Sequence, residues 1–319
     1  MKGIRTLDGI FLTHGHKDHA GCLDILLQCF PTEAVYYSGS DSFSYHEILP
    51  WDCAEKRGSR AAALKGGEIL DLGGVTAEVF IPPVTDPENE NNNSLILKLT
   101  HGDCSCLMMG DAELQEERQL MDSRMDLQAD ILKLGHHGED DATSPAFLDL
   151  VKPSIGLVAG NEEENPQSMD PMIADLLKSR DVRCWYSECP GLALEFTSDG
   201  NTFTQSVLAD RELPGSLSLS ISRADRKNQR ITIRNQGEDT ADLSGSLLYS
   251  LRRDEVFRFP DGTSLEPGGE LTVACLDADE PGDLTWEQES VWQKKRDDAL
   301  LFDENLNLLD LSPAGSSGS

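Results

Sequence analysis

The sequence contains no run of about 18 apolar residues, which is the length a helix needs to cross a bilayer. We therefore predict no membrane span in this chain. Only about a dozen residues precede the first histidine-rich motif, which leaves no room for the charged, apolar and cleavage regions of a signal peptide. The first residues therefore indicate no export route.

Cysteine is scarce as well. Eight cysteines in 319 residues are too few for a disulfide scaffold, and none has the CxxC spacing of a structural zinc site. Cys104 and Cys106 share one face of an expected strand, which favours buried thiols. For an exported protein, a disulfide between Cys184 and Cys189 across a turn is an alternative.

Positive charge is also in short supply. The chain has 27 Lys and Arg against 57 Asp and Glu, a formal net charge of −30 at pH 7. This balance counts against nonspecific binding of nucleic acid by a broad basic patch. It does not exclude a phosphoester substrate, because two divalent cations concentrate about four positive charges at one point, whereas salt screens a diffuse acidic surface.

The length is sufficient for two domains that each bury a core. Short apolar runs alternate with helical patterns in the first part, which predicts an α/β or layered α+β domain over residues 1–205. Within it we expect a β-hairpin around Gly102 and helices at 20–30, 112–121 and 173–180. The polar, breaker-rich segment 86–93 is expected to be a loop.

A different pattern follows a predicted linker at residues 206–216. Short alternating strands separated by Gly, Pro and Asp turns predict an all-β sandwich over residues 217–311. The expected strands are 217–221, 231–234, 243–249 and 271–275, with one helix at 286–295. Residues 312–319 are expected to be a flexible tail.

The strongest local pattern is a cluster of metal-ligand side chains directly after the apolar residues 10–12. His14, His16, Asp18 and His19 supply four potential ligands within six residues, and Gly15 lets the backbone turn tightly between them. Imidazole nitrogens and carboxylate oxygens are ligands of zinc and related cations. A histidine-rich surface loop is the alternative, but this density of ligands after a strand favours a metal site.

Two further features are weaker. His136 and His137 stand between two glycines, and because adjacent side chains cannot easily bind one ion, we expect one ligand and one residue that either supports a ligand or contacts substrate. A buried, hydrogen-bonded histidine pair is the alternative. Asp111 follows a strand and a glycine, which alone is typical of a turn. His46 and His101 lie outside these motifs and are expected to be surface histidines.

An HxHxDH motif after a strand resembles the signature of the metallo-β-lactamase superfamily, whose fold is a four-layered αβ/βα sandwich with metals at the sheet edges. Residues 92–97, 107–113 and 129–138 look like the ComEC-type branch, which comprises DNA-uptake competence proteins and their stand-alone relatives. Their order and spacing match over about residues 1–205.

The resemblance implies two divalent metal ions, Zn or Mn, and a role for each matching residue. The implied metal ligands are His14 and His16 for the first ion, Asp18 and His19 for the second, Asp111 as a bridge, and His136. Asp18 and His137 are the implied catalytic residues, the histidine pair offering an acid for the leaving oxygen. Asn93 and Ser94 would bind substrate. Two ions about 3.5–4 Å apart lower the pKa of a shared water and so supply hydroxide at neutral pH.

This chain departs from the family pattern at three places. Glu139 stands where relatives have Ser, and Asp170 with Pro171 stands where they have His-Pro. Asp170, which we count among the substrate-binding residues, would make the site harder and favour manganese or magnesium over zinc. Relatives also have several strands before HxHxDH, so we expect a longer protein whose missing part carries these strands and an export signal. The expected location is then extracellular or in the cell envelope.

The second domain resembles the lamin-tail domain, an immunoglobulin-like sandwich, through motifs spread over residues 217–311. Such domains accompany secreted or surface nucleases and phosphoesterases in bacteria, which implies a cell-surface or extracellular partner. Trp286 and Trp292 form either a binding surface or part of the core, and their spacing favours the core.

The sequence thus predicts a metal-dependent hydrolase that cleaves phosphodiesters, with DNA as the expected substrate. Two alternatives remain open. The same dinuclear centre attacks carbonyl carbon, so the substrate is alternatively a small ester, a lactone or a β-lactam. The third hypothesis is a binding or scaffold protein without catalysis, which the Asp170 difference and the missing strands motivate.

Overall fold

The computed structural model describes residues 4–39, 49–160, 169–186, 193–208, 218–293, 297–304 and 308–313. His46 and Cys189 lie outside these residues, and so do the predictions made for them. The chain divides into two compact units, one of residues 9–22 and 34–210 and the other of residues 1–8, 23–33 and 211–319. Residues 1–8 and 23–33 thus group with the C-terminal part, although the predicted boundary kept them within residues 1–205.

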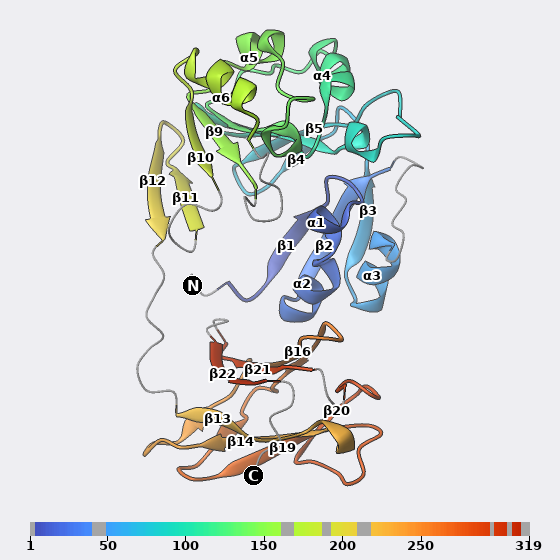
Figure 1. Cartoon of the computed structure of the whole chain (residues 1–319), viewed down its shortest axis with the longest axis vertical. Helices are drawn as coiled ribbons and strands as arrows, with labels where there is room; N and C mark the ends of the chain where they lie inside the picture. Colours follow the sequence, from blue (N-terminus) through green and yellow to red (C-terminus); the bar gives the residue numbers. More distant parts are fainter. Residues whose placement is uncertain are drawn as a thin grey trace. The chain divides into compact units, whose positions relative to one another are not determined.

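A three-stranded sheet of order β1-β2-β3 begins the chain (Figure 1). Its strands are β1 (Leu7–Phe11), β2 (Thr32–Ser38) and β3 (Arg60–Leu64), and β2 pairs with β3 in parallel. The helices between them are α1 (Lys17–Ala20), α2 (Leu23–Cys29) and α3 (Pro50–Lys56). Pro50 suits the first turn of α3, because a residue there needs no backbone N–H donor.

The second sheet of this part has seven strands in the order β10-β9-β8-β7-β6-β5-β4. The strands are β4 (Ile69–Asp71), β5 (Thr76–Phe80), β6 (Ile96–His101), β7 (Cys104–Met108), β8 (Ile131–Lys133), β9 (Ile155–Val158) and β10 (Arg183–Tyr186). Strands β4 to β7 pair antiparallel and β7 to β10 pair in parallel. The expected hairpin around Gly102 is confirmed as β6 and β7.

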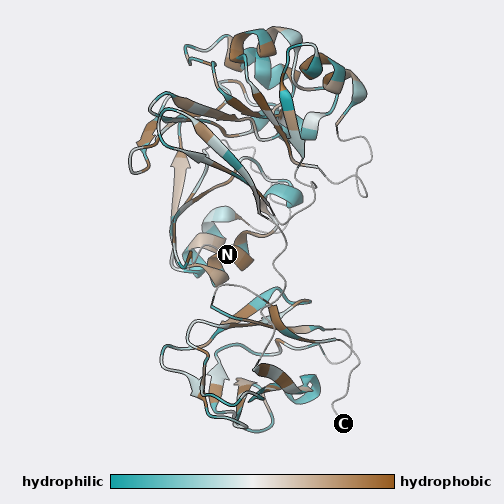
Figure 2. Cartoon of the chain, turned by 90° about the vertical axis from the view of Figure 1, so that its left-hand side faces the viewer, coloured by the Kyte–Doolittle hydropathy of each residue, from teal (hydrophilic) through white to brown (hydrophobic). Residues whose placement is uncertain are grey.

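Helices cover one face of the seven-stranded sheet. They are α4 (Leu114–Met121), α5 (Pro145–Val151) and α6 (Pro171–Lys178), which lie together in Figure 1. In Figure 2 the helices carry both hydrophobic and hydrophilic stretches, as expected for helices with one buried face. Phe147, Ile173 and Leu177 lie on those buried faces, in one core with Ile96, Leu132 and other residues of the sheet. The helices predicted at 112–121 and 173–180 are confirmed.

The two sheets pack against each other through a second set of apolar side chains. Leu64 from β3 lies in one cluster with Val79 and Leu97 of the larger sheet, and Phe11 and Tyr36 pack against it. Two sheets face to face, with helices covering the far side of the larger one, form the expected layered αβ/βα arrangement. Among the described residues, no helix is both long and apolar enough to cross a membrane.

A hairpin of β11 (Ala193–Ser198) and β12 (Phe203–Leu208) follows the larger sheet. Because β12 continues through Leu208, the linker predicted from residue 206 begins too early. The remaining strands are β13 (Leu219–Asp225), β14 (Arg230–Asn235), β15 (Ala241–Asp242), β16 (Leu247–Ser250), β17 (Glu255–Arg258), β18 (Ser264–Leu265), β19 (Glu270–Cys275), β20 (Leu284–Trp286), β21 (Ala299–Phe302) and β22 (Leu308–Ser312).

Eight of these C-terminal strands form two four-stranded sheets, β13-β14-β19-β20 and β17-β16-β21-β22, and β15 pairs with β18. Ile231 of the first sheet and Leu301 of the second lie in the same buried core, which is how two sheets pack in a sandwich. Trp286 and Trp292 are buried in that core with ring centroids 5.6 Å apart, so the prediction of core packing is confirmed. The helix predicted at 286–295 is wrong, because Trp286 ends β20 and residues 287–293 are irregular.

Candidate metal centre

The loop after β1 carries the first group of site residues. It is fixed to the larger sheet, where the amide of Leu95 donates to the carbonyl of Thr13 at 2.7 Å. The Thr13 hydroxyl lies 3.1 Å from Nδ1 of His14 and 3.3 Å from Nδ1 of His19. One hydroxyl therefore contacts both rings at Nδ1, and Nε2 of each lies on the opposite side of its ring.

Asp111 follows β7, and the backbone conformation of Gly110 places it beside the histidine loop. Gly110 has φ +57°, and a Cβ there would lie 2.8 Å from Oγ of Ser94 and 3.0 Å from Cβ of Thr13. Only glycine has neither the steric nor the conformational cost at this position. The Ser94 hydroxyl accepts a hydrogen bond from the backbone amide of Asp111 at 3.1 Å and so fixes the backbone of that residue.

The two adjacent histidines after β8 face different groups. His136 and His137 have φ of +39° and +56°, a left-handed conformation that non-glycine residues rarely adopt and that often marks a functional site. Nδ1 of His137 lies 2.6 Å from the carbonyl of Ala159, so this nitrogen carries a proton and Nε2 is directed at Asp111. Nδ1 of His136 instead contacts Asp141 at 2.8 Å.

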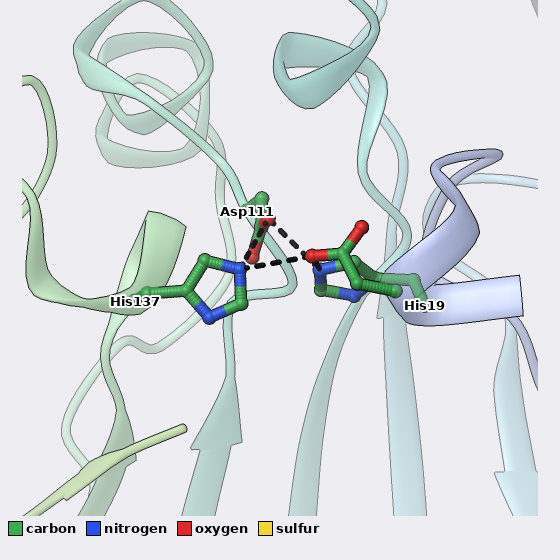
Figure 3. A group of neighbouring side chains, drawn as sticks. His19, Asp111 and His137 are labelled. Atoms are coloured by element: carbon green, nitrogen blue, oxygen red, sulfur yellow. Dashed lines mark ion pairs between the residues drawn. The ribbon is translucent and has the colours of Figure 1, made fainter. Parts of the chain in front are cut away.

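Three imidazoles converge on one carboxylate oxygen, as Figure 3 shows for His19 and His137. Oδ2 of Asp111 lies 2.9 Å from Nε2 of His19, 3.2 Å from that of His137 and 3.8 Å from that of His14. Asp18 adds a second carboxylate, with Oδ2 3.3 Å from Nε2 of His137. We call the group of His14, Asp18, His19, Asp111 and His137 the Asp111 centre.

His16 lies at the border of this centre. Its side chain is on an exposed residue, and its Nδ1 is 3.1 Å from Nε2 of buried His14. Two imidazole nitrogens at this separation can share one cation, as the motif predicts. The structure therefore brings His14, His16, Asp18, His19 and Asp111 together.

Burial sets the charges of the centre. Burial, with the neighbouring His19, lowers the pKa of His14 to about 3, so this ring is neutral at pH 7. Burial alone would raise the pKa of Asp111, but its hydrogen bond with His137 and the nearby Lys133 charge hold that pKa below its usual range. Asp111 is therefore an anion, and its hydrogen bond with His137 raises the pKa of that ring.

The donor set fits divalent cations. Asp18, His19, Asp111 and His137 each offer one ligand atom, and these atoms all lie within 4.8 Å of one another. Nε2 of His19 is buried and has no hydrogen-bond partner, although it lies at ion-pair distance from Asp111. In metal sites the second nitrogen of a histidine ligand is similarly held by a hydrogen bond, as Nδ1 is here for His14, His19 and His137.

Four predicted site residues have other surroundings in the structure. His136 was predicted as the ligand of the histidine pair, but it contacts Asp141 and Asn91, and its neighbour His137 faces Asp111. The left-handed backbone of the pair turns the two rings apart. His137, and not His136, is therefore the ring of the pair that faces Asp111.

The other three are the predicted substrate-binding residues. Asn93 is 2% exposed and holds the loop before it by bonding the amide and the carbonyl of Asp86. Ser94 is fully buried beneath Asp111, so it positions that residue and cannot touch substrate. Asp170 caps α6 by accepting from the amide of Met172 at 2.7 Å, which is the ordinary role of aspartate before a helix.

The sequence interpretation missed Lys133 and Thr13. Nζ of Lys133 lies 3.3 Å from Oδ1 of Asp111 and donates to the carbonyl of Gly110. Burial lowers the pKa of this lysine, which Asp111 partly offsets. The signal was available, since a lysine between the buried residues Leu132 and Leu134 of a strand requires an anionic partner. Thr13 carried no comparable signal.

Comparisons with known proteins agree with this arrangement. Residues 2–160 match the family model of the metallo-beta-lactamase superfamily. ComE operon protein 3 of Bacillus subtilis is 27% identical over 182 residues, which are 57% of this chain and 24% of that protein. Competence protein ComA of Neisseria gonorrhoeae is 24% identical over 195 residues, 61% of this chain and 26% of that protein. The match thus spans about a quarter of the length of these relatives.

Among solved structures, the metallo-beta-lactamase fold protein YhfI from Bacillus subtilis aligns with 56% of this chain and 73% of its own, at 14% identity and a TM-score of 0.38. The histidine loop after β1 and Asp111 after β7 occur within the matched residues. The N-terminal part of this chain is therefore a metallo-β-lactamase superfamily domain.

Proposed function

We propose that this protein is a metal-dependent phosphodiesterase that acts on DNA. The observation that carries the proposal is the convergence of three Nε2 atoms on Oδ2 of Asp111, with the Asp18 carboxylate 3.3 Å from one of them, that of His137. Two curated relatives are a competence protein and a protein of the ComE operon, which favours DNA over other phosphodiesters. The matched region is a part of each relative, so this substrate rests on the likeness of the domain.

The residues divide the work of such a reaction. Divalent cations at this centre would supply hydroxide from water at neutral pH and neutralise the charge of a phosphodiester. The Ser94 hydroxyl and Lys133 anchor Asp111, and this fixes the position of the negative charge of its carboxylate. Asp18 has a side chain that is 62% exposed, so it marks the open side from which a substrate reaches the centre.

The test uses the whole chain loaded with Mn²⁺, labelled single-stranded DNA and a chromogenic phosphodiester. We expect both to be cleaved, and we expect Asp111→Asn to lose more than about 100-fold in rate because the carboxylate that gathers the imidazoles is gone. Asp103→Asn is the matched control, since Asp103 is an exposed carboxylate in the turn before the same strand. The control should keep the wild-type rate.

The alternative substrate class is a small ester, lactone or β-lactam. The net charge of −30 favours it, because an acidic surface repels a polyanion more than a small molecule. A chromogenic ester is therefore assayed beside the two phosphodiesters. Turnover of the ester without cleavage of either phosphodiester would reject the nuclease, and absence of all turnover in a metal-loaded protein would favour a scaffold.

A further inference from the structure

We propose that His136 is a positioning residue, which holds His137 in the orientation that faces Asp111. This role rests on the proposed function, because the ring that is positioned belongs to the centre of that reaction. Nδ1 of His136 lies 2.8 Å from Oδ1 of Asp141, and its Nε2 lies 3.2 Å from Nδ2 of Asn91. Both nitrogens of the ring thus contact protein groups, one on each side.

Both partners of the ring are tied to residues 111–114, the segment that carries the aspartate of the centre. Nδ2 of Asn91 donates to Oε1 of Glu113 at 2.8 Å, and Glu113 accepts from two more asparagine side chains of the same loop. The backbone carbonyl of Asp141 accepts from the amide of Leu114 at 2.8 Å. The ring is therefore fixed relative to the same segment that the neighbouring histidine faces.

The backbone of the histidine pair requires such an anchor. Its φ angles are +39° at His136 and +56° at His137, in a region that residues other than glycine rarely adopt. Such a conformation persists only where the surrounding structure holds it. The amide of Glu139 donates to the carbonyl of His136 at 2.9 Å, which closes the turn but does not connect it to residues 111–114. The ring contacts of His136 supply that connection.

The orientation of His137 depends on this backbone. Its Nδ1 lies 2.6 Å from the carbonyl of Ala159, and its Nε2 lies 3.2 Å from Oδ2 of Asp111. The two contacts lie on opposite sides of the ring, so a backbone that turns the ring away breaks both. Loss of the His136 ring therefore acts on metal binding through its neighbour, because every residue of the Asp111 centre is still present.

The first test follows the hydrogen bond between His137 and Ala159 by NMR in the metal-free whole chain. This bond slows the exchange of the Nδ1 proton with water, and His137→Phe assigns its signal. We expect the signal to be lost in His136→Phe, which keeps a planar ring but has no nitrogen. His101→Phe is the matched control, since His101 is another half-buried histidine that contacts a side chain, that of Ser198. The control should keep the signal.

Two substitutions of Asp141 test the same anchor with little risk to folding, because this side chain is 41% exposed. Asp141→Ala removes the partner of Nδ1 and should weaken the signal of the His137 proton. Asp141→Asn keeps an acceptor oxygen at the same place and should restore the signal. A signal that is as strong in His136→Phe and Asp141→Ala as in the wild type would overturn the proposal.

The second test measures the Kd for Mn²⁺ from the EPR signal of the free ion, on the same proteins. We expect His136→Phe to raise the Kd about 10-fold or more, which is the usual effect of removing a group that orients a metal ligand. Asp141→Asn should stay close to the wild type. Phe147→Leu controls for loss of stability alone, since Phe147 lies in the core beneath α5. It should lower the Tm and keep the Kd.

A His136→Phe protein that behaves like Phe147→Leu, with a lower Tm and an unchanged Kd, would also overturn the proposal. The NMR measurement uses neither metal nor substrate, so its result is independent of the phosphodiesterase assay. If no phosphodiester is cleaved and the His137 signal still depends on His136 and Asp141, the proposed function fails and the positioning role stands.

Discussion

Single hydrogen bonds decide which nitrogen of each histidine faces Asp111. Thr13 contacts Nδ1 of His14 and His19, and the Ala159 carbonyl accepts from Nδ1 of His137. Neither partner is part of the HxHxDH motif, although Thr13 directly precedes it. They nevertheless direct the Nε2 atoms, because the second nitrogen of an imidazole lies on the opposite side of the ring.

Lys133 contributes a positive charge to the Asp111 centre but is not one of its proposed metal ligands, so its substitution tests the charge alone. Its side chain is 13% exposed and lies beside the Asp111 carboxylate. Lys133→Met would leave that carboxylate without its fixed cation, which costs about 3–5 kcal/mol for a buried pair. Bound cations would take over the compensation. We therefore expect a large loss of unfolding free energy in EDTA and a smaller loss in Mn²⁺, measured by urea unfolding.

Lys98→Met is the matched control for this prediction. Lys98 is also a buried lysine of the same sheet, but its partner is the exposed Asp126, away from the Asp111 centre. Its loss of stability should be the same in EDTA and in Mn²⁺. If Lys133→Met showed the same cost in both solutions, the lysine would have no coupling to the metal centre.

For single residues, the sequence predicted which side chains belong to the centre better than it predicted the role of each. The motif identified His14, His16, Asp18 and His19 because ligand density is visible in the letters. It could not distinguish His136 from His137, since the choice depends on two left-handed residues whose φ angles no local pattern shows. The roles expected of Asn93 and Ser94 failed for a related reason, because burial beneath the loop is a tertiary property.

Among the elements, helix α4 supports the centre from below. Glu116 on α4 is fully buried, and its Oε2 accepts from the amide of Ser94 at 3.0 Å. Ser94 in turn accepts from the amide of Asp111. The helix, the end of the loop before β6 and the end of β7 are thus joined by two consecutive hydrogen bonds.

The buried acid predicts a pH dependence of stability. Burial raises the pKa of Glu116 well above its usual value, although the Ser94 amide opposes the shift. The folded protein therefore holds this proton more tightly than the unfolded chain does. The stabilisation is complete below the usual pKa and is lost as pH rises through the raised one.

Glu116→Gln should remove this part of the pH dependence, because glutamine accepts from Ser94 without ionising. Between about pH 5 and about pH 8, the variant should lose less unfolding free energy than the wild type in urea titrations. Exposed Glu88→Gln is the control and should follow the wild type. Parallel curves for the wild type and Glu116→Gln would contradict the assignment of a buried protonated acid.

The elements themselves were partly predictable. Alternation and turn residues located the hairpin of β6 and β7 and the strands of the sandwich, since these patterns follow from one buried face. The helix expected at 286–295 failed because Trp286 and Trp292 are buried in the sandwich core without a helix. In the structure they enter the core from a strand end and from irregular chain.

For the whole molecule, the resemblance predicted the fold class, and the family match over residues 2–160 confirms it for the N-terminal part. The lamin-tail assignment of the C-terminal strands, an extracellular location and a surface partner stay predictions. The location and the partner depend on cellular context, which the pattern of apolar and polar residues in the sequence does not encode.

The central claim is that His19, His137 and Asp111 hold divalent cations at one place. Anomalous diffraction at a manganese absorption edge, from crystals of the whole chain grown with Mn²⁺, tests it most directly. We expect a peak within bonding distance of the Asp111 carboxylate and of Nε2 of His19 or His137, and no such peak in Asp111→Asn. A metal-loaded crystal whose peaks all lie away from Asp111 would contradict it.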